Sequence, residues 1–129
     1  MAIVPVFCMC QGLMIALVIF LSAESCNASP ISFKLKVFCE NSLNGYLFDG
    51  ENVNKSKEYT LDILDRVGGG DSFTAGILHG LLNQMTCEET VEFATCASVL
   101  KHSISGDMNL VSKKDVYTLM MSGVENINR

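Results

Sequence analysis

The sequence predicts an α/β fold in which a short β-meander is followed by three helices, the order found at the C-terminal end of an α/β sandwich. Three observations predict this fold. Apolar and polar residues alternate in segments between residues 33 and 64, as in half-buried strands. Directly after the triglycine 68–70 the apolar residues change to helical spacing, and two later segments open with capping-box sequences. The length of 129 residues is that of one domain.

The expected strands precede the triglycine. Residues Phe33–Cys39 alternate apolar and charged positions before an apolar close, which predicts a half-buried strand. Asn44-Gly45 predicts a turn, and Tyr46–Phe48 is a short apolar run that ends at Asp49-Gly50. The segment Glu58–Leu64 alternates again, with its apolar residues on one face. Together these segments predict a small β-meander.

The first helix is expected from about Ser72 to Gln84. Phe73, Ile77 and Leu81 fall at i, i+4 and i+8, so they would share the buried face. The motif Gly76-x-x-x-Gly80 is explained by close packing of this helix against the sheet, because the apolar stretch is too short for a membrane helix dimer.

Two further helices are predicted from the residues that begin them. In a capping box, a hydroxyl and a carboxylate three residues apart each bind the other residue's backbone amide. The pair Thr86 and Glu89 predicts a second helix that continues to about His102. The pair Ser112 and Asp115 predicts a third helix that continues to about Met121, where Gly123 supplies the C-terminal stop. The helix dipole is sufficient to explain a histidine at the end of the second helix.

Because an apolar run extends from Ile3 to Leu21, we separate residues 1–30 as a leader from a domain over residues 31–129. Only Gln11 is clearly polar between Ile3 and Leu21, and this run just reaches the length of a bilayer-spanning helix. No Lys or Arg precedes Lys34, so the basic flank of a secretory signal is missing. Two alternatives stay open. Either residues 1–25 act as an export or membrane leader, with membrane contact through residues 3–21, or they are a misjoined piece of a gene model or a strand region of a larger parent, and the protein is cytoplasmic.

Charge and cysteine content exclude several functional classes. The net charge is −5 and the nine Lys and Arg residues are scattered, so no basic stripe is available to bind nucleic acid. The six cysteines include no C-x-x-C pair, so a zinc–thiolate site is not expected. Their wide spacing fits free thiols of a reducing compartment better than a disulfide framework. Homo-oligomerisation is left open.

The segment 65–76 carries the predicted chemistry. It follows an expected strand and opens a helix, where Gly68, Gly69 and Gly70 allow a tight turn and leave N–H groups beside the positive end of the helix dipole. That combination is typical of an anion site. Asp71 beside it could take the proton from a hydroxyl that attacks a γ-phosphorus. The alternative is that Asp71 only stabilises the first turn of the helix. Neither the P-loop nor the G-x-G-x-x-G pattern matches, because no Lys follows the glycines and their spacing differs.

The segment D-R-V-G-G-G-D-S-F-T-A-G (residues 65–76) resembles the second signature of the ribokinase-like (PfkB) carbohydrate kinase family, D-x-x-G-A-G-D-x-F-x-A-G. The stretch 97–112 (A-S-V-L-K-H-S-I-S-G-D-M-N-L-V-S) looks like the corresponding stretch of 2-keto-3-deoxygluconate kinases in that family. The segments 45–50 and 56–59 resemble the hairpin that precedes the signature in the same kinases. The resemblance covers about residues 40–129 and implies the C-terminal portion of a ribokinase-like α/β/α sandwich.

The resemblance also implies roles for individual residues. Asp71 would be the catalytic base, and Gly68, Gly69 and Gly70 the anion hole for the transferring phosphate of ATP. The remaining implied positions are Ala97, Lys101, Gly106 and Asn109 on the nucleotide wall, and Asp65 and Val67 at a monovalent cation such as K⁺. Mg²⁺ would arrive with ATP, and no side chain is assigned to it. The implied acceptor is a sugar or sugar acid similar to 2-keto-3-deoxygluconate.

Parts of the family pattern have no counterpart in this sequence. Nothing before residue 40 resembles the substrate-binding region, its β-lid or the first glycine-rich signature, and the N-x-x-E element associated with Mg²⁺ is absent. Two functions are therefore kept. The first is a sugar kinase or a truncated member of that family, and the second is a non-catalytic nucleotide-binding or membrane-tethered remnant of the same fold.

Overall fold

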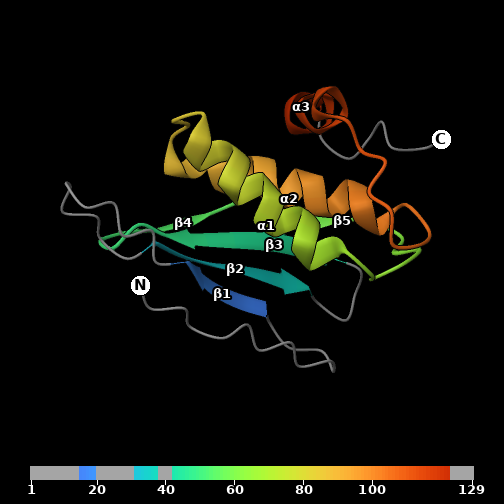
Figure 1. Ribbon diagram of the computed structural model, residues 1–129, viewed down its shortest axis with the longest axis horizontal. Coiled ribbons are helices and arrows are strands. Elements are labelled where there is room, and N and C mark those ends of the chain that lie inside the picture. Colours follow the sequence, from blue (N-terminus) through green and yellow to red (C-terminus); the bar gives the residue numbers. More distant parts are fainter. Residues whose placement is uncertain (1–14, 20–30, 38–41, 123–129) are drawn as a thin grey trace.

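The computed structural model describes residues 15–19, 31–37 and 42–122 (Figure 1). Its elements confirm the predicted order of strands followed by three helices. The strands are β1 (Ile15–Ile19), β2 (Ile31–Val37), β3 (Ser42–Phe48), β4 (Val53–Lys55) and β5 (Tyr59–Thr60), and the helices are α1 (Gly69–Leu82), α2 (Cys87–His102) and α3 (Lys113–Ser122). Helices α1 and α2 lie side by side over one face of the sheet, and α3 packs on α2 away from the sheet (Figure 1).

All strand pairs in the described part of the chain are antiparallel. The sheet runs in the order β1-β2-β3-β4, and β5 pairs with the same edge of β3 as β4. Ser56 bridges the gap between β4 and β5, because its amide donates to Gly45 O at 3.0 Å and its hydroxyl accepts from Gly45 N at 2.8 Å. Strand β3 is thus paired along both edges and lies beneath the helices.

Part of the amino-terminal apolar run is a strand. Residues 15–19 form β1, in which Leu17 lies opposite Phe33 of β2. The rest of the segment 1–30, and Gly123 at the expected end of the third helix, lie outside the described residues. Among the residues that the structure describes, no helix combines the length and the apolar character needed to cross a bilayer. The alternatives for the leader stay predictions.

The turn predicted at Asn44-Gly45 is wrong, because both residues lie inside β3. A side chain at Gly45 would meet those of Thr95 and Phe73, and Phe73 Cε2 lies 2.6 Å from an ideal Cβ position. Glycine is therefore needed for the close approach of α1 and α2 to the sheet, and not for turn geometry. The predicted end of this strand at Phe48 is confirmed.

The predicted strand Glu58–Leu64 is shorter than expected, because only Tyr59–Thr60 pairs with the sheet. Leu61 and Ile63, the next apolar residues of the segment, still pack against the core. The chain then leaves the sheet, and the amides of Leu64 and Asp65 donate to His102 O at 2.9 Å and 3.3 Å. The alternating pattern in this segment therefore reflects burial and not a continuous strand.

Helix α1 begins at Gly69 rather than Ser72 and packs closely against α2. An ideal Cβ at Gly76 would lie 2.5 Å from Ala94 Cα, and one at Gly80 would lie 2.5 Å from Thr90 Oγ1. These small residues face α2 and not the sheet, which corrects the packing partner that we predicted. Because the two helices run antiparallel, the first turn of α1 meets the last turn of α2.

The apolar core lies between the sheet and the helices. The largest fully buried apolar side chains are Leu43, Leu47, Phe73, Ile77, Val91 and Val99. Cys87 is half-buried and Cys96 is buried, and both are free thiols as predicted. The other four cysteines (8, 10, 26 and 39) lie outside the described residues.

A buried carboxylate joins β5 to α2. Glu92 is 9% exposed and accepts hydrogen bonds from the Tyr59 hydroxyl and from the Lys57 amide, the latter at 2.8 Å. Cys96 Sγ donates to the Tyr59 oxygen at 3.2 Å. Burial, reinforced by the hydrogen bonds to Cys96 and Glu92, raises the pKa of Tyr59 far above its ordinary value. This network fixes the strand edge to the second helix.

Candidate functional site

The candidate site lies at the first turn of α1. Its N-cap, Gly68, has a φ of 78°, in the left-handed region that glycine favours, and no side chain caps the helix. The first helical hydrogen bond runs from the Ser72 amide to Gly68 O at 2.9 Å. The amides of Gly69, Gly70 and Asp71 precede that bond and have no acceptor within the helix. They form a set of N–H donors at the positive end of a 14-residue helix.

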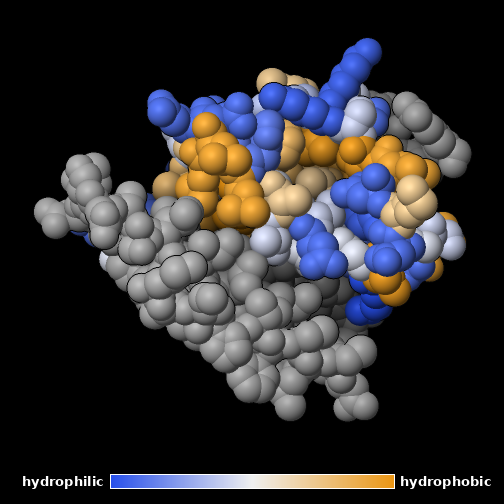
Figure 2. All heavy atoms as spheres, viewed as in Figure 1, coloured by the Kyte–Doolittle hydropathy of each residue, from blue (hydrophilic) through white to orange (hydrophobic). Residues whose placement is uncertain are grey.

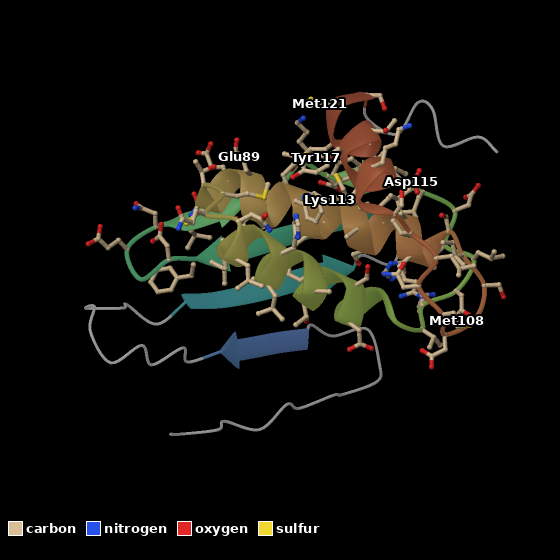
Figure 3. The ribbon with its side chains drawn as sticks, turned by 45° about the horizontal axis from the view of Figure 1, so that its top comes forward. Glu89, Met108, Lys113, Asp115, Tyr117 and Met121 are labelled. Atoms are coloured by element: carbon tan, nitrogen blue, oxygen red, sulfur yellow. The ribbon has the colours of Figure 1, made fainter. Side chains whose placement is uncertain are left out.

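At α2 and α3, side chains of the capping residues bind the amides at the start of the helix. Each of the three helices has a carboxylate at its third residue, namely Asp71, Glu89 and Asp115. At α2, Thr86 Oγ1 accepts from the Glu89 amide at 3.2 Å, and the Thr86 amide donates to Glu89 Oε2 at 3.0 Å. Ser112 and Asp115 make the equivalent pair at α3, at 3.3 Å and 3.1 Å. Both predicted capping boxes are confirmed, and Figure 3 shows Glu89 and Asp115 at the starts of their helices.

Asp71 differs from the two capping carboxylates. It is exposed, and its side chain makes no hydrogen bond or ion pair with the described part of the chain. The N-cap before it is a glycine, which has no hydroxyl to bind. The carboxylate is therefore available to accept a proton from a ligand hydroxyl, on the same helical turn as the open amides.

The last turn of α2 lies directly behind this site. The His102 ring is 3% exposed and packs on Gly69, where an ideal Cβ would lie 2.6 Å from His102 Nε2. Ser98 Oγ donates to Gly69 O at 2.9 Å, and His102 Nδ1 lies 2.7 Å from Ser98 O. Because a carbonyl only accepts, Nδ1 carries the proton of the ring. Burial, followed by the charges of Arg66 and Lys101, lowers the pKa of His102 and keeps the ring neutral.

Ser98 and His102 are functional-site neighbours that the sequence analysis missed. The helix dipole sufficed there to explain His102. The signal that reveals them is their spacing of four residues on one face of α2, opposite the glycines of α1. That signal has meaning only once the two helices are known to pack antiparallel.

Asp65 and Lys101 tie two loops together beside Gly68. Asp65 Oδ1 accepts from the Val67 amide at 3.0 Å, and Oδ2 accepts from the Gly106 amide at 2.9 Å. Lys101 Nζ donates to Gly106 O at 2.7 Å. The hydrogen bonds from Val67 and Gly106, followed by the charge of Lys101, lower the pKa of Asp65. The segments 65–68 and 104–107 are thereby held next to each other.

The four residues predicted for the nucleotide wall lie at two depths. Ala97 is 7% exposed and Lys101 is 0% exposed, so both lie behind the surface, whereas Gly106 and Asn109 are exposed. Asn109 Nδ2 donates to Ser72 Oγ at 3.1 Å, and Ser72 Oγ donates to Ala97 O at 3.0 Å. These two bonds connect the loop after α2 to the first turn of α1.

Exposed apolar side chains border the open amides. Met108 and Leu110 flank Asn109 and are 74% and 71% exposed, and Val67, next to Gly68, is 53% exposed. Figure 3 shows Met108 on the loop that follows α2. Apolar patches interrupted by hydrophilic side chains are also visible over the helices in Figure 2. The site therefore combines polar donors with an apolar margin.

No group of three or more His, Cys, Asp or Glu side chains that could hold a metal ion occurs within residues 42–122. Asp65 is the carboxylate closest in sequence to the open amides apart from Asp71. Each of its oxygens accepts one amide, which leaves lone pairs for a hard cation. Asp65 is thus a side chain near the amides that offers free oxygen lone pairs to a cation.

Comparison with known families gives one match that includes the whole site. The model described as "pfkB family carbohydrate kinase" matches residues 45–114. This range is more than half of the 129 residues and contains both the first turn of α1 and the loop after α2.

Individual proteins agree with the family match. A PfkB family carbohydrate kinase from Listeria grayi is 36% identical, with a TM-score of 0.59 over 84% of this chain and 29% of that chain. For 2-dehydro-3-deoxygluconokinase from Thermotoga maritima, the identity is 30% and the TM-score 0.60, over 84% of this chain and 28% of that one. Among curated proteins, 2-dehydro-3-deoxygalactonokinase from Haloferax volcanii is 25% identical over 80 residues.

These matches confirm the predicted α/β fold class, and their coverage shows how much of each relative this chain spans. The chain spans 25% of the length of the Haloferax relative and less than a third of the two solved structures.

Proposed function

The chain belongs to the pfkB family of carbohydrate kinases, and from that premise we propose that it takes part in ATP-dependent phosphorylation of a sugar or sugar-acid hydroxyl. The observation that carries the proposal is the first turn of α1, where amides without helical acceptors lie beside the exposed carboxylate of Asp71. Because the chain spans only part of its relatives, the activity of the whole protein belongs to the proposal.

The open amides would hold the phosphoryl group that is transferred. In this assignment Gly68, Gly69 and Gly70 form the anion hole: Gly68 turns the chain, and the amides of Gly69 and Gly70, followed by that of Asp71, stabilise with the helix dipole the charge that develops on the phosphate oxygens. The donors are fixed before the ligand arrives, because His102 and Ser98 hold Gly69 from behind. Removing one such donor typically slows a reaction by about 10²–10³-fold.

Asp71 would act as the general base. Its carboxylate takes the proton of the acceptor hydroxyl while that oxygen forms a bond to the γ-phosphorus, and the bond from that phosphorus to the bridging oxygen breaks to release ADP. The reaction needs little more from the protein than position and charge stabilisation. An exposed carboxylate that no capping interaction engages meets this requirement.

The nucleotide would lie along the loop after α2. Gly106 and Asn109 are at the surface there, while Ala97 and Lys101 support them from behind. When bound with ATP, Mg²⁺ would neutralise phosphate charge, and no side chain of this chain is assigned to it. Asp65 and the backbone of Val67 would hold a monovalent cation such as K⁺.

We place the acceptor in the class of 2-keto-3-deoxy sugar acids, similar to 2-keto-3-deoxygluconate. The names of the Thermotoga structure and the Haloferax relative support this substrate class. We place the reaction in the cytoplasm, which the free thiols of Cys87 and Cys96 support.

A second candidate is a nucleotide-binding remnant without phosphoryl transfer, tethered to a membrane if the leader acts as an anchor. The observation that favours it is the make-up of the site, because apart from Asp71 every residue assigned above would serve the phosphate, the nucleotide or a cation, and binding alone would use the same residues. Both candidates require ATP to bind at α1, and only the first requires turnover.

The experiment that separates the two candidates is a coupled ADP-release assay with ATP and 2-keto-3-deoxygluconate. Wild type is compared with Asp71→Asn and with Asp62→Asn, which removes an exposed carboxylate outside the site. Turnover that depends on Asp71 and not on Asp62 supports the kinase. ATP binding without turnover in folded wild type supports the remnant, and absence of ATP binding overturns both.

A further inference from the structure

Lys101 is a buried cation that forms no ion pair with the described part of the chain, and the carboxylate within reach of its charge is Asp65. Its side chain is 0% exposed, and the ion pair found among the described residues joins Lys57 and Glu92 instead. Lys101 Nζ donates to the carbonyl oxygens of Gly106 at 2.7 Å and Ile104 at 3.4 Å. Carbonyl dipoles satisfy its donors but leave its net charge in place. A charge retained inside the protein acts over a longer distance than one at the surface, because water screens it less.

The position of this charge is next to the N-cap of α1. An ideal Cβ at Gly68 would lie 3.0 Å from Lys101 Cε and 3.8 Å from Lys101 Nζ. The ammonium therefore lies beside the residue whose carbonyl accepts the first helical hydrogen bond. Since the helix dipole places partial positive charge at the same end, the two fields add.

The surroundings of the site make such a charge useful. Asp65 and Asp107 lie in the segments 65–68 and 104–107, Asp71 lies on the first turn of α1, and Arg66 is a second cation in the segment 65–68. The chain as a whole has a net charge of −5. A phosphate anion that approaches the open amides would meet these carboxylates, and their repulsion has to be offset.

We propose that Lys101 is a positioning residue for the phosphate site of the proposed function, on which this inference rests. Its buried charge raises the affinity of the α1 amides for multiply charged phosphates without touching the ligand. Its hydrogen bonds also hold the segment 104–106 against the site. Its full burial excludes direct contact with a ligand at the surface.

A test can separate the charge of Lys101 from its structural contribution. Lys101→Gln keeps a hydrogen-bond donor and removes the charge, and Lys101→Met removes both. Lys114→Gln is the matched control, since it makes the same charge change at an exposed residue of α3. Dissociation constants are measured for ATP and for adenosine by NMR titration at constant low ionic strength.

The expected result is a loss of ATP affinity of about tenfold in Lys101→Gln, with adenosine affinity changed by less than about twofold. Lys101→Met should lose at least as much ATP affinity. The control should change neither constant by more than about twofold, because an exposed charge is screened. Equal losses of ATP and adenosine affinity would show a purely structural role and overturn the proposal.

The same measurements distinguish a failure of the role proposed for Lys101 from a failure of the proposed kinase function. Wild type that binds ATP while Lys101→Gln binds it equally well overturns the inference alone. Wild type that does not bind ATP overturns the proposed function and the inference with it. If the uncharged variants do not fold, Lys101→Arg, which keeps charge and donors, is expected to retain ATP affinity within about threefold. A loss of more than about tenfold in that variant, when folded, is contrary to the proposal.

Discussion

Helices α1 and α2 pack against each other but begin in opposite ways. At α2 the hydroxyl of Thr86 and the carboxylate of Glu89 bind each other's amides, so the protein itself satisfies the donors of the first turn. At α1 the N-cap is Gly68, no side chain caps the helix, and the carboxylate at the equivalent third position, Asp71, faces solvent. At α2 the carboxylate of the first turn is therefore hydrogen-bonded to a backbone amide, whereas at α1 the carboxylate of the first turn has no such bond.

This difference separates stability from function. Because glycine is itself a tolerated N-cap, α1 forgoes only about a few tenths of a kcal/mol relative to a Ser or Thr cap. Instead its first turn is held from behind by the last turn of α2, where His102 packs on Gly69 and Ser98 binds its carbonyl. The first turn contacts α2 at the buried Gly69 and reaches the surface at Gly70 and Asp71, an arrangement that fits the proposed anion site.

The largest effect is expected when the first-turn carboxylate of each helix is replaced by the matching side-chain amide. Asp71→Asn should lower turnover by about 10²–10⁴-fold, because the base is removed, whereas Glu89→Gln, the matched change at α2, should leave turnover unchanged. Each change removes a charge that favours the helix dipole and should lower the free energy of unfolding by about 0.3–1 kcal/mol, since Gln keeps the acceptor for the Thr86 amide. A coupled kinase assay and urea denaturation measure the two quantities. Equal turnover in wild type and Asp71→Asn would rule out the base assignment.

A methyl group at the first residue of α1 should give the next largest effect. Gly69→Ala places a Cβ against the buried His102 ring and should destabilise the fold by about 1–3 kcal/mol. Cys87→Ala makes the comparable change at the first residue of α2 and should cost less than about 1 kcal/mol. Urea melts of both variants test the difference, and similar values for the two would mean that α1 is not held by the contact with His102.

Removing the cap of α2 should produce a smaller effect that is confined to stability. Thr86→Ala is expected to cost about 1 kcal/mol, since the two hydrogen bonds that the Thr86 hydroxyl makes with Glu89 are lost. ATP affinity, measured by calorimetry, should not change, because the open amides belong to the other helix. A large loss of ATP affinity would show that the two N-termini are coupled.

The smallest expected effect is a pH dependence of stability from His102. Its pKa is lowered in the folded state, so below its ordinary value of about 6.5 the unfolded chain binds more protons than the folded one. Stability should therefore fall as pH decreases from 7.5 to 5.5. The aspartates with lowered pKa, Asp49 and Asp65, titrate below this window. His102→Gln should flatten the profile in urea melts, and an unchanged slope would assign the effect elsewhere.

The features that were predictable from sequence are local ones. The boxes at Thr86 and Ser112 and the glycine turn before Asp71 depend on residues within one turn of each other, and all three are found where expected. The turn at Asn44-Gly45 was misassigned, because the reason for Gly45 is contact with residues of both helices.

The residues that pack behind the first turn of α1 could not be predicted from their neighbours in the sequence either. Lys101 and His102 follow an apolar stretch of α2, and their burial depends on glycines more than thirty positions earlier in the chain. A side chain that fills the space left by a distant glycine has no signature within its own helix. Asp65, Gly106 and Asn109 belong to loops whose pairing only the fold reveals.

The buried phenol of Tyr59 supplies an internal optical reporter for this chain. It is one of three tyrosines, and burial, with the hydrogen bonds to Cys96 and Glu92, raises its pKa far above that of an exposed phenol. Loss of that proton in alkali, visible as the ultraviolet change of a phenolate, therefore requires β5 to detach from the second helix. Absorbance alone, without label or ligand, would follow the opening of the sheet edge.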